Sequence, residues 1–181
     1  MRSFTGWKAV EVQLALFRWL EMRGRRMVLP NFTPRGWHEC DMFSMTQAMY
    51  FHEIEVKVSR SDFRSDFNKR GKHRGLAGTS YDSHLSHRPR TFCYAAPQGL
   101  LMVEDMPDYA GLIVVRDKWV KPYPGSPPAY EVEVLKKPPV LKVGKLSAEQ
   151  MLRMTECLWY RYANTWKELA VRKIEGVSDG R

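Results

Sequence analysis

The chain has 181 residues, 44% of them hydrophobic, which suits one domain with a hydrophobic core of its own. No apolar run approaches membrane-spanning length, and the first residues lack the apolar stretch of a secretory signal, so we expect an intracellular protein. The formal net charge of +9 favours a polyanionic partner but does not specify one. Three widely spaced cysteines match no zinc or disulfide pattern, which is typical of a reducing compartment.

Hydrophobic periodicity and turn residues divide the chain into helices and strands. In chain order, the pattern predicts a helix over 8–23, strands over 27–32, about 37–44 and about 49–58, a helix capped by Ser59 or Ser61, an aperiodic basic loop over 71–90, strands over 91–96 and 111–115, an edge strand or arm over 131–135, and a long helix opened by a capping box at 147–150. Three consecutive strands with helices on each side indicate an α/β fold around a mixed central sheet. We expect a core over 1–118, with a Pro-rich segment and a C-terminal helix over 119–181 packed on it or appended to it.

Charged side chains alternate with aliphatic ones along the third predicted strand. A strand places alternate residues on one face, so Glu53, Glu55 and Lys57 are expected side by side. The preceding predicted strand carries Asp41, and Glu39 has the same parity and is a further candidate. The alternative is an ordinary solvated face, in which Glu55 and Lys57 form an ion pair on an exposed strand.

These residue types suit a divalent cation beside a phosphodiester. Magnesium prefers oxygen ligands and keeps several waters, so Asp41, Glu55 and the carbonyl of Val56 are sufficient protein ligands. Lys57 would orient the attacking water or stabilise the charge that builds on the phosphate. Glu11, on the first helix, is an extra carboxylate that could reach the same pocket. The residues therefore favour metal-dependent cleavage of DNA.

Basic residues crowd the stretch that follows the charged strand. Those expected to hold the DNA backbone, without reading bases, are Arg60, Arg64, Lys69, Arg70, Lys72 and Arg74. A solvated basic loop is the alternative explanation for part of this run.

Four segments together resemble a known superfamily. They are Glu39–Phe43, Glu53–Asp66, Phe92–Leu100 and Pro107–Ile113. The chain resembles the PD-(D/E)XK nucleases, and within them the MmcB-type DNA-repair group and related phage proteins. The resemblance implies a restriction-endonuclease-like core, in which helices flank a central sheet and the active site lies on adjacent strands.

The resemblance also implies roles for single residues. Asp41 matches the first acid of the motif, Glu55 the second acid and Lys57 the lysine, while Glu11 matches an acid that many members carry on the first helix. The residue before Asp41 is Cys40, where the name of the superfamily places a proline. From about residue 119 onward the resemblance no longer covers the chain.

The expected function is therefore a magnesium-dependent deoxyribonuclease, endonuclease or exonuclease, in DNA repair, recombination or phage DNA metabolism. Manganese is expected to substitute for magnesium. A non-cleaving nucleic-acid-binding accessory protein on a nuclease fold is the alternative, and a role on RNA is a third hypothesis. The expected location is the cytoplasm of a bacterial or phage-infected cell, with DNA as partner and a homodimer left open, because many relatives of this fold form dimers.

Overall fold

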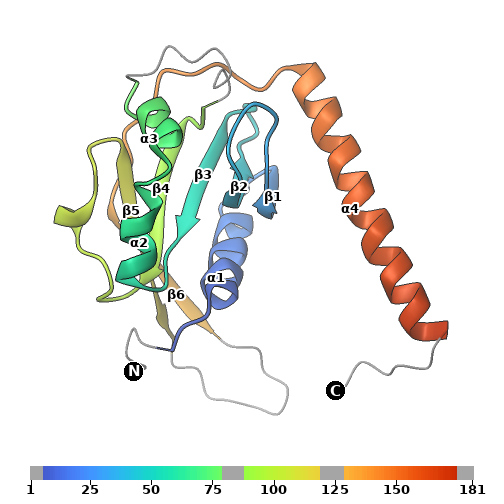
Figure 1. The fold of residues 1–181 in the computed structure, drawn as a ribbon, viewed down its shortest axis with the longest axis horizontal. Helices are drawn as coiled ribbons and strands as arrows, with labels where there is room; N and C mark the ends of the chain where they lie inside the picture. The colour runs from blue at the N-terminus through green and yellow to red at the C-terminus, as the bar shows by residue number, and fades with distance from the viewer. Residues whose placement is uncertain (1–5, 79–87, 119–128, 175–181) are drawn as a thin grey trace. The chain divides into compact units, whose positions relative to one another are not determined.

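The computed structural model describes residues 6–78, 88–118 and 129–174 (Figure 1). The chain divides into two compact units, Met1–Lys145 and Leu146–Arg181. The described elements are α1 (Ala9–Met22), β1 (Met27–Phe32), β2 (Cys40–Met45), β3 (Phe51–Val56), α2 (Arg60–Asp66), α3 (Arg70–Leu76), β4 (Thr91–Pro97), the 3-10 turn η2 (Val103–Asp105), β5 (Ala110–Asp117), β6 (Tyr130–Lys136) and α4 (Ala148–Ile174). Within these ranges, no helix combines the length and apolar character needed to cross a membrane.

The described strands form one mixed sheet in the order β1-β2-β3-β4-β5-β6. Pairing is antiparallel from β1 to β3, parallel from β3 to β5, and antiparallel between β5 and β6. The predicted α/β class with a mixed sheet is thus confirmed. Pro30 lies in β1 at the edge of the sheet, where a residue without a backbone N–H is tolerated.

The last strand of the sheet lies beyond the predicted core. The segment predicted as an edge strand or arm is β6, which pairs with β5, so the boundary expected at residue 118 moves to residue 145. A Cβ on Gly111 would lie 2.7 Å from the carbonyl oxygen of Lys136 and from the nitrogen of Pro138. Glycine at this position therefore lets the chain leaving β6 pass close to β5. The Pro-rich passage predicted before β6 lies largely at 119–128, outside the described residues.

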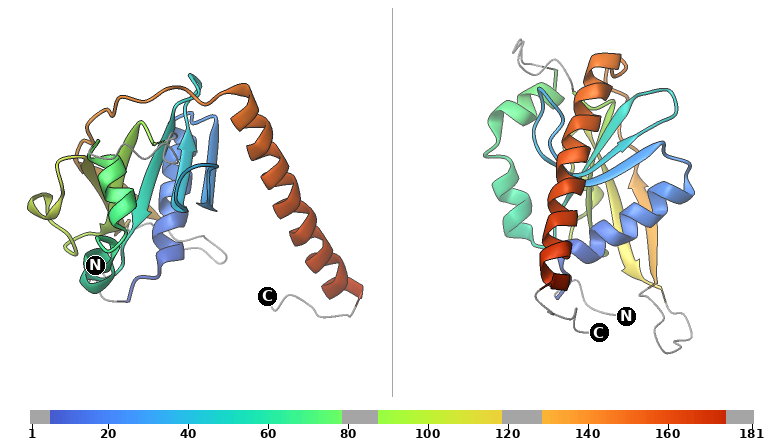
Figure 2. Two further views of the ribbon diagram at one scale, coloured as in Figure 1. Left: turned by 45° about the horizontal axis from the view of Figure 1, so that its top comes forward. Right: turned by 90° about the vertical axis from the view of Figure 1, so that its right-hand side faces the viewer.

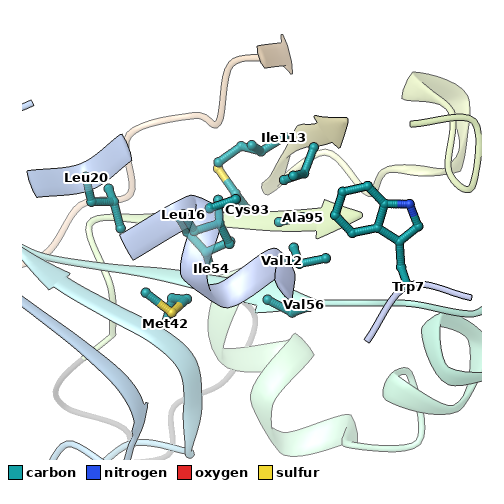
Figure 3. Packing of buried hydrophobic residues seen from close by; sticks show 12 residues of the cluster. Trp7, Val12, Leu16, Leu20, Met42, Ile54, Val56, Cys93, Ala95 and Ile113 are labelled. Atoms are coloured by element: carbon teal, nitrogen blue, oxygen red, sulfur yellow. The ribbon is translucent and has the colours of Figure 1, made fainter. Parts of the chain in front are cut away.

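One face of the sheet packs against α1 to form the main hydrophobic core (Figure 3). Val12, Leu16 and Leu20 recur at helical spacing on α1 and are buried against the aliphatic residues of the central strands. The strand residues of this cluster include Ile54 and Val56 of β3, which leaves their charged neighbours on the other face. Burial of each such aliphatic side chain stabilises the fold by about 1.5–3 kcal/mol.

The opposite face is covered by α2 and α3, which connect β3 to β4 (Figures 1 and 2). Ser59 caps α2 as predicted, since its Oγ accepts a hydrogen bond of 3.1 Å from the backbone N–H of Asp62. The ring of Phe63 packs edge-on against Tyr94 of β4 at 4.9 Å. The aperiodic loop predicted over 71–90 is wrong at its start, because α3 spans Arg70–Leu76, whereas residues 79–87 lie outside the described range.

The second unit contains α4, and its predicted capping box is present. Ser147 Oγ accepts from the backbone N–H of Gln150 at 3.2 Å, and Gln150 Oε1 accepts from the backbone N–H of Ser147 at 2.7 Å. Trp159, Tyr162 and Trp166 recur along the helix and are exposed to at least 60%. A homodimer stays a prediction.

Candidate active site

The charged residues of β3, and Lys57 directly after it, lie on the face of the sheet that α2 and α3 cover. Glu53, Glu55 and Lys57 are 0%, 3% and 3% exposed, although all three side chains carry ionisable groups. Their common face was predicted from their alternation, but their burial was not. The alternative of an ion pair on a solvated strand is therefore wrong. Isolated charges are costly to bury, so each group needs a partner.

Asp41 of β2 joins this set from the neighbouring strand. Met42 pairs with Ile54, so one residue further along the same antiparallel register brings Asp41 opposite Glu55. Its Oδ2 accepts a hydrogen bond of 2.7 Å from the backbone N–H of Val56. Burial and the charge of Glu55 raise the pKa of Asp41 to about 6. Two carboxylates of neighbouring strands are thus held close enough to repel each other.

Three lysines surround the carboxylate of Glu55. Its Oε1 lies 3.1 Å from Nζ of Lys57 and 3.1 Å from Nζ of Lys69, and its Oε2 lies 2.8 Å from Nζ of Lys72. Burial by itself raises the pKa of Glu55, but the ammonium groups of Lys72 and Lys57 outweigh it and lower the value. Glu55 is therefore ionised in the folded protein.

Lys72 bridges the two glutamates of β3. Its Nζ lies 2.7 Å from Glu53 Oε1 and 2.8 Å from Glu55 Oε2, and its side chain is fully buried. Burial alone would lower the pKa of Lys72, but the two carboxylates raise it above its ordinary value. The second oxygen of Glu53 accepts a hydrogen bond from the indole N–H of Trp37. Lys72 was predicted to contact DNA, and its complete burial corrects that prediction.

Asp66, the last residue of α2, forms hydrogen bonds and ion pairs with residues of several elements. Its Oδ1 lies 3.2 Å from Nζ of Lys57 and 2.9 Å from Nζ of Lys69, and its Oδ2 accepts from the hydroxyl of Tyr94 at 2.9 Å. His73 Nε2 lies 2.9 Å from the backbone oxygen of Asp66. Burial by itself raises the pKa of Asp66, but His73, whose Nε2 lies 3.3 Å from Oδ2, and the ammonium groups of Lys69 and Lys57 lower it well below its ordinary range. Asp66 thereby connects α2 and α3 to the charged strand.

The remaining basic residues predicted to contact DNA lie on α2, on α3 and at Lys69, which precedes α3. Those exposed are Arg60, Arg64, Arg70 and Arg74, together with Lys69, whose side chain is 50% exposed. The arginines are spaced by four residues within each helix, so each helix presents a pair of them on one side. Contact with a polyanion stays a prediction that this exposure supports.

Glu11 lies on α1, the helix that packs on the other face of the sheet. Its Oε2 accepts a hydrogen bond of 2.8 Å from the backbone N–H of Lys8, which satisfies a free donor at the start of the helix. This contact gives Glu11 a capping role, and its role as a ligand remains a prediction. Two residues further along, the side chain of Gln13 donates to the carbonyl oxygen of Asp41 at 3.1 Å.

The donor set around Asp41 and Glu55 limits how a metal could bind. Among the described residues, no group of three or more His, Cys, Asp or Glu side chains is arranged to hold a metal ion. Asp41 and Glu55 would be the protein carboxylates, with waters, a phosphate or a carbonyl such as that of Val56 completing the shell. Magnesium is commonly held by one or two carboxylates in this way, so the residues fit the predicted ion.

Comparison with known proteins bears on the fold. No family model matches the chain, and no curated protein matches it. The chain is similar to a solved structure described as SPO1766 protein of unknown function from Silicibacter pomeroyi. The identity is 17% and the TM-score 0.58, over 97% of this chain and 99% of that chain. The likeness shows a shared fold.

Sequence reasoning missed the pairing of Glu53 and the participation of Asp66 and Tyr94, for different reasons. Glu53 shares strand parity with Glu55, so its place was visible, but its pairing was not. Asp66 follows Asp62 and Phe63 at helical spacing, which could have indicated that it faces the sheet. For Tyr94, an apolar strand offers no local signal that its hydroxyl will reach Asp66.

The raised pKa of Asp41 predicts a stability change on substitution. Its folded-state pKa, about 6, exceeds the ordinary value, so the folded protein keeps a proton that the unfolded chain releases between about pH 4 and 6. The contribution of Asp41 to stability therefore falls as pH rises through this window. Asp41→Asn keeps an acceptor for the Val56 N–H and should raise the free energy of unfolding by about 1–2 kcal/mol at pH 8, with no gain at pH 4.

Urea denaturation in EDTA at the two pH values measures this difference. Asp108→Asn, at an exposed position, is the matched control. An equal effect of Asp41→Asn at both pH values would contradict the prediction.

Proposed function

We propose that this protein is a divalent-metal-dependent phosphodiesterase acting on DNA. The observation that carries the proposal is the convergence of Asp41 and Glu55 from neighbouring strands, with Nζ of Lys57 3.1 Å from Glu55 Oε1. A mixed sheet with helices on both faces is compatible with the restriction-endonuclease-like core that the resemblance implies. The likeness to a structure of unknown function leaves the activity to experiment.

In this proposal each residue of the site has a separate role. Asp41 and Glu55 would hold the ion, which when bound supplies a Lewis acid and lowers the pKa of a water molecule. Lys57 would donate from its ammonium to the scissile phosphate or to the attacking water. Asp66 holds that ammonium at 3.2 Å, so it acts as a positioning residue for Lys57. No covalent intermediate with the protein is needed.

The exposed arginines of α2 and α3 would hold the DNA backbone. Arg64 and Arg74 are exposed on the helices that flank Asp66 and Lys69, so a strand bound along them would pass near the proposed site. Backbone contacts of this kind fix position and carry no sequence information. The proposal therefore includes no particular recognition sequence.

A second candidate is supported by one specific observation. The carboxylates of Glu53, Glu55 and Asp66 are matched by the ammonium groups of Lys57, Lys69 and Lys72, all within the distances given above. Such a network is electrically balanced without a metal ion. A protein that binds nucleic acid without cleaving it, with the acidic strand serving structure alone, would have this property.

The test is cleavage of labelled duplex, single-stranded, flap and junction DNA, with a matched set of RNAs. Each would be incubated with Mg²⁺, Mn²⁺ or EDTA, using wild type, Glu55→Gln and, as a control, Glu131→Gln. Glu131 pairs with Arg116 at the β5–β6 edge of the sheet and is half-exposed.

Metal-dependent cutting that Glu55→Gln abolishes and Glu131→Gln retains is the expected result. Preferential cutting of RNA would identify RNA, in place of DNA, as the substrate. Salt-sensitive binding of DNA by all three proteins without cutting in either metal would replace the proposal with the non-cleaving alternative.

A further inference from the structure

Lys57 and Lys69 occupy the same two oxygen atoms. Glu55 Oε1 lies 3.1 Å from each ammonium, and Asp66 Oδ1 lies 3.2 Å from Lys57 Nζ and 2.9 Å from Lys69 Nζ. A carboxylate oxygen has two lone pairs, so both acceptor positions of Glu55 Oε1 are filled by lysine. An ion that binds Glu55 through this oxygen must therefore displace one of the two ammonium groups.

The two lysines differ in how readily they can leave. The side chain of Lys57 is 4% exposed, whereas that of Lys69 is 50% exposed. A half-exposed ammonium is rehydrated as it moves away, and its ion pair is already weakened by water. Removing the buried Lys57 would instead separate charges in a region that water does not reach. Lys69 is the group that can move at low cost.

The remaining oxygen of Glu55, Oε2, accepts from one ammonium, that of Lys72, whose positive charge would repel a cation bound at the same oxygen. Lys72 is fully buried between Glu53 and Glu55, so its displacement would leave the buried Glu53 without its ammonium partner and Glu55 Oε2 without its donor. The backbone of Lys69 is anchored because its N–H donates to the carbonyl of Asp66 at 2.9 Å. Only the side chain of Lys69 has to change rotamer, which exposed residues do within nanoseconds.

We infer that Lys69 is an exchangeable counter-ion of the proposed metal site: its ammonium occupies the ligand position on Glu55 in the metal-free protein and is released when a divalent ion binds. The released Lys69 lies next to Arg70, on the exposed side of α3, where it adds a positive charge for the DNA backbone. The binding of metal and of DNA are thereby coupled through one side chain. This inference rests on the proposed function, since it requires that Asp41 and Glu55 bind an ion.

The test compares Lys69→Met with Arg70→Met, which removes the same charge from an exposed position one residue away. Mn²⁺ affinity is measured by calorimetry and by the electron paramagnetic resonance of free Mn²⁺, without DNA. Lys69→Met should bind Mn²⁺ about three- to fivefold more tightly than wild type, because a competing cation is gone. Arg70→Met should stay within about twofold of wild type, because its charge does not compete for Glu55.

DNA affinity supplies a second readout that a purely structural role would not change. It is measured in EDTA and in Ca²⁺, which occupies oxygen sites and is expected not to support cleavage. Lys69→Met should lose DNA affinity relative to wild type only in Ca²⁺, whereas Arg70→Met should lose it in both conditions. Thermal melting checks that both variants are folded.

The experiment distinguishes a failure of the proposed metal site from a failure of the exchange of Lys69. If wild-type protein binds no Mn²⁺, both the proposed metal site and the role of Lys69 are overturned. If wild type binds Mn²⁺ and Lys69→Met binds it equally or more weakly, the exchange is overturned and the metal site stands. Equal losses of DNA affinity in EDTA and Ca²⁺ would also overturn the release of Lys69.

Discussion

Replacing Lys72 with methionine is expected to lower the free energy of unfolding by about 3–5 kcal/mol, a large fraction of the stability of a domain of this size. Lys72 is fully buried, and its ammonium pairs with Glu53 at 2.7 Å and with Glu55 at 2.8 Å. Methionine fills a similar volume but leaves two buried carboxylates close together. The loss comes from this unpaired charge rather than from a cavity. Urea denaturation at pH 7.5 measures it.

The matched control is the double variant Lys72→Met with Glu53→Gln. The amide introduced by Glu53→Gln is uncharged and can still accept from the indole of Trp37, the partner of Glu53 in the wild type. Because one unpaired charge is removed, the double variant should recover at least about 1 kcal/mol relative to Lys72→Met. A loss below about 1 kcal/mol in the single variant would show that Lys72 is unimportant to the network. No recovery in the double variant would show that the loss does not come from the unpaired charge of Glu53.

Replacing Lys57 with methionine is expected to reduce the rate of metal-dependent cleavage by about 10²–10³-fold. Lys57 directly follows β3, its ammonium lies 3.1 Å from Glu55 Oε1, and Asp66 holds it in place. The loss is expected in the chemical step, because the 4% exposure of Lys57 leaves little surface for holding DNA in the ground state. Single-turnover cleavage rates, set against DNA affinity in Ca²⁺, separate the two effects.

Lys57→Arg serves as the comparison, since it keeps the charge in a larger, planar group and should rescue little of the rate. Glu55 and Asp66 each keep other donors when Lys57 is replaced, so the variant should fold. A cleavage rate within about threefold of wild type would exclude Lys57 from the chemistry. A loss of Mn²⁺ affinity equal to the loss of rate would instead indicate that Lys57 supports the metal ligands.

Local patterns predicted much of the fold because they report interactions between residues near in sequence. The helical spacing of apolar residues predicted α1, and the hydroxyls of Ser59 and Ser61 predicted the start of α2, which Ser59 caps. The helix at Arg70–Leu76 was missed because glycines at 71 and 75 weaken its local helical signal. Its buried residues, among them Lys72, acquire their environment only when the helix crosses the sheet.

The candidate site was predicted in part, because strand alternation, like helical spacing, depends only on residues near in sequence. Strand alternation places Glu53, Glu55 and Lys57 on one face whatever the rest of the chain does. That face could have been solvated, and a sheet with one wet face would have had the same sequence pattern. The packing of α2 and α3 over β3 made it a buried network, and this packing depends on contacts between distant segments.

By itself, the sequence determined the strand that carries the acid-x-lysine pattern, the acid on the strand before it, the basic residues that follow and the mixed α/β class. Only the tertiary structure decided that Lys72 is a buried partner of two glutamates and that Asp66 positions Lys57. It also decided that Lys69 and Lys57 contact the same carboxylate oxygens. The physical reason is that alternation and helical period are properties of a few neighbouring residues. Charge pairing between β3, α2 and α3 instead arises when elements separated in sequence exclude water together.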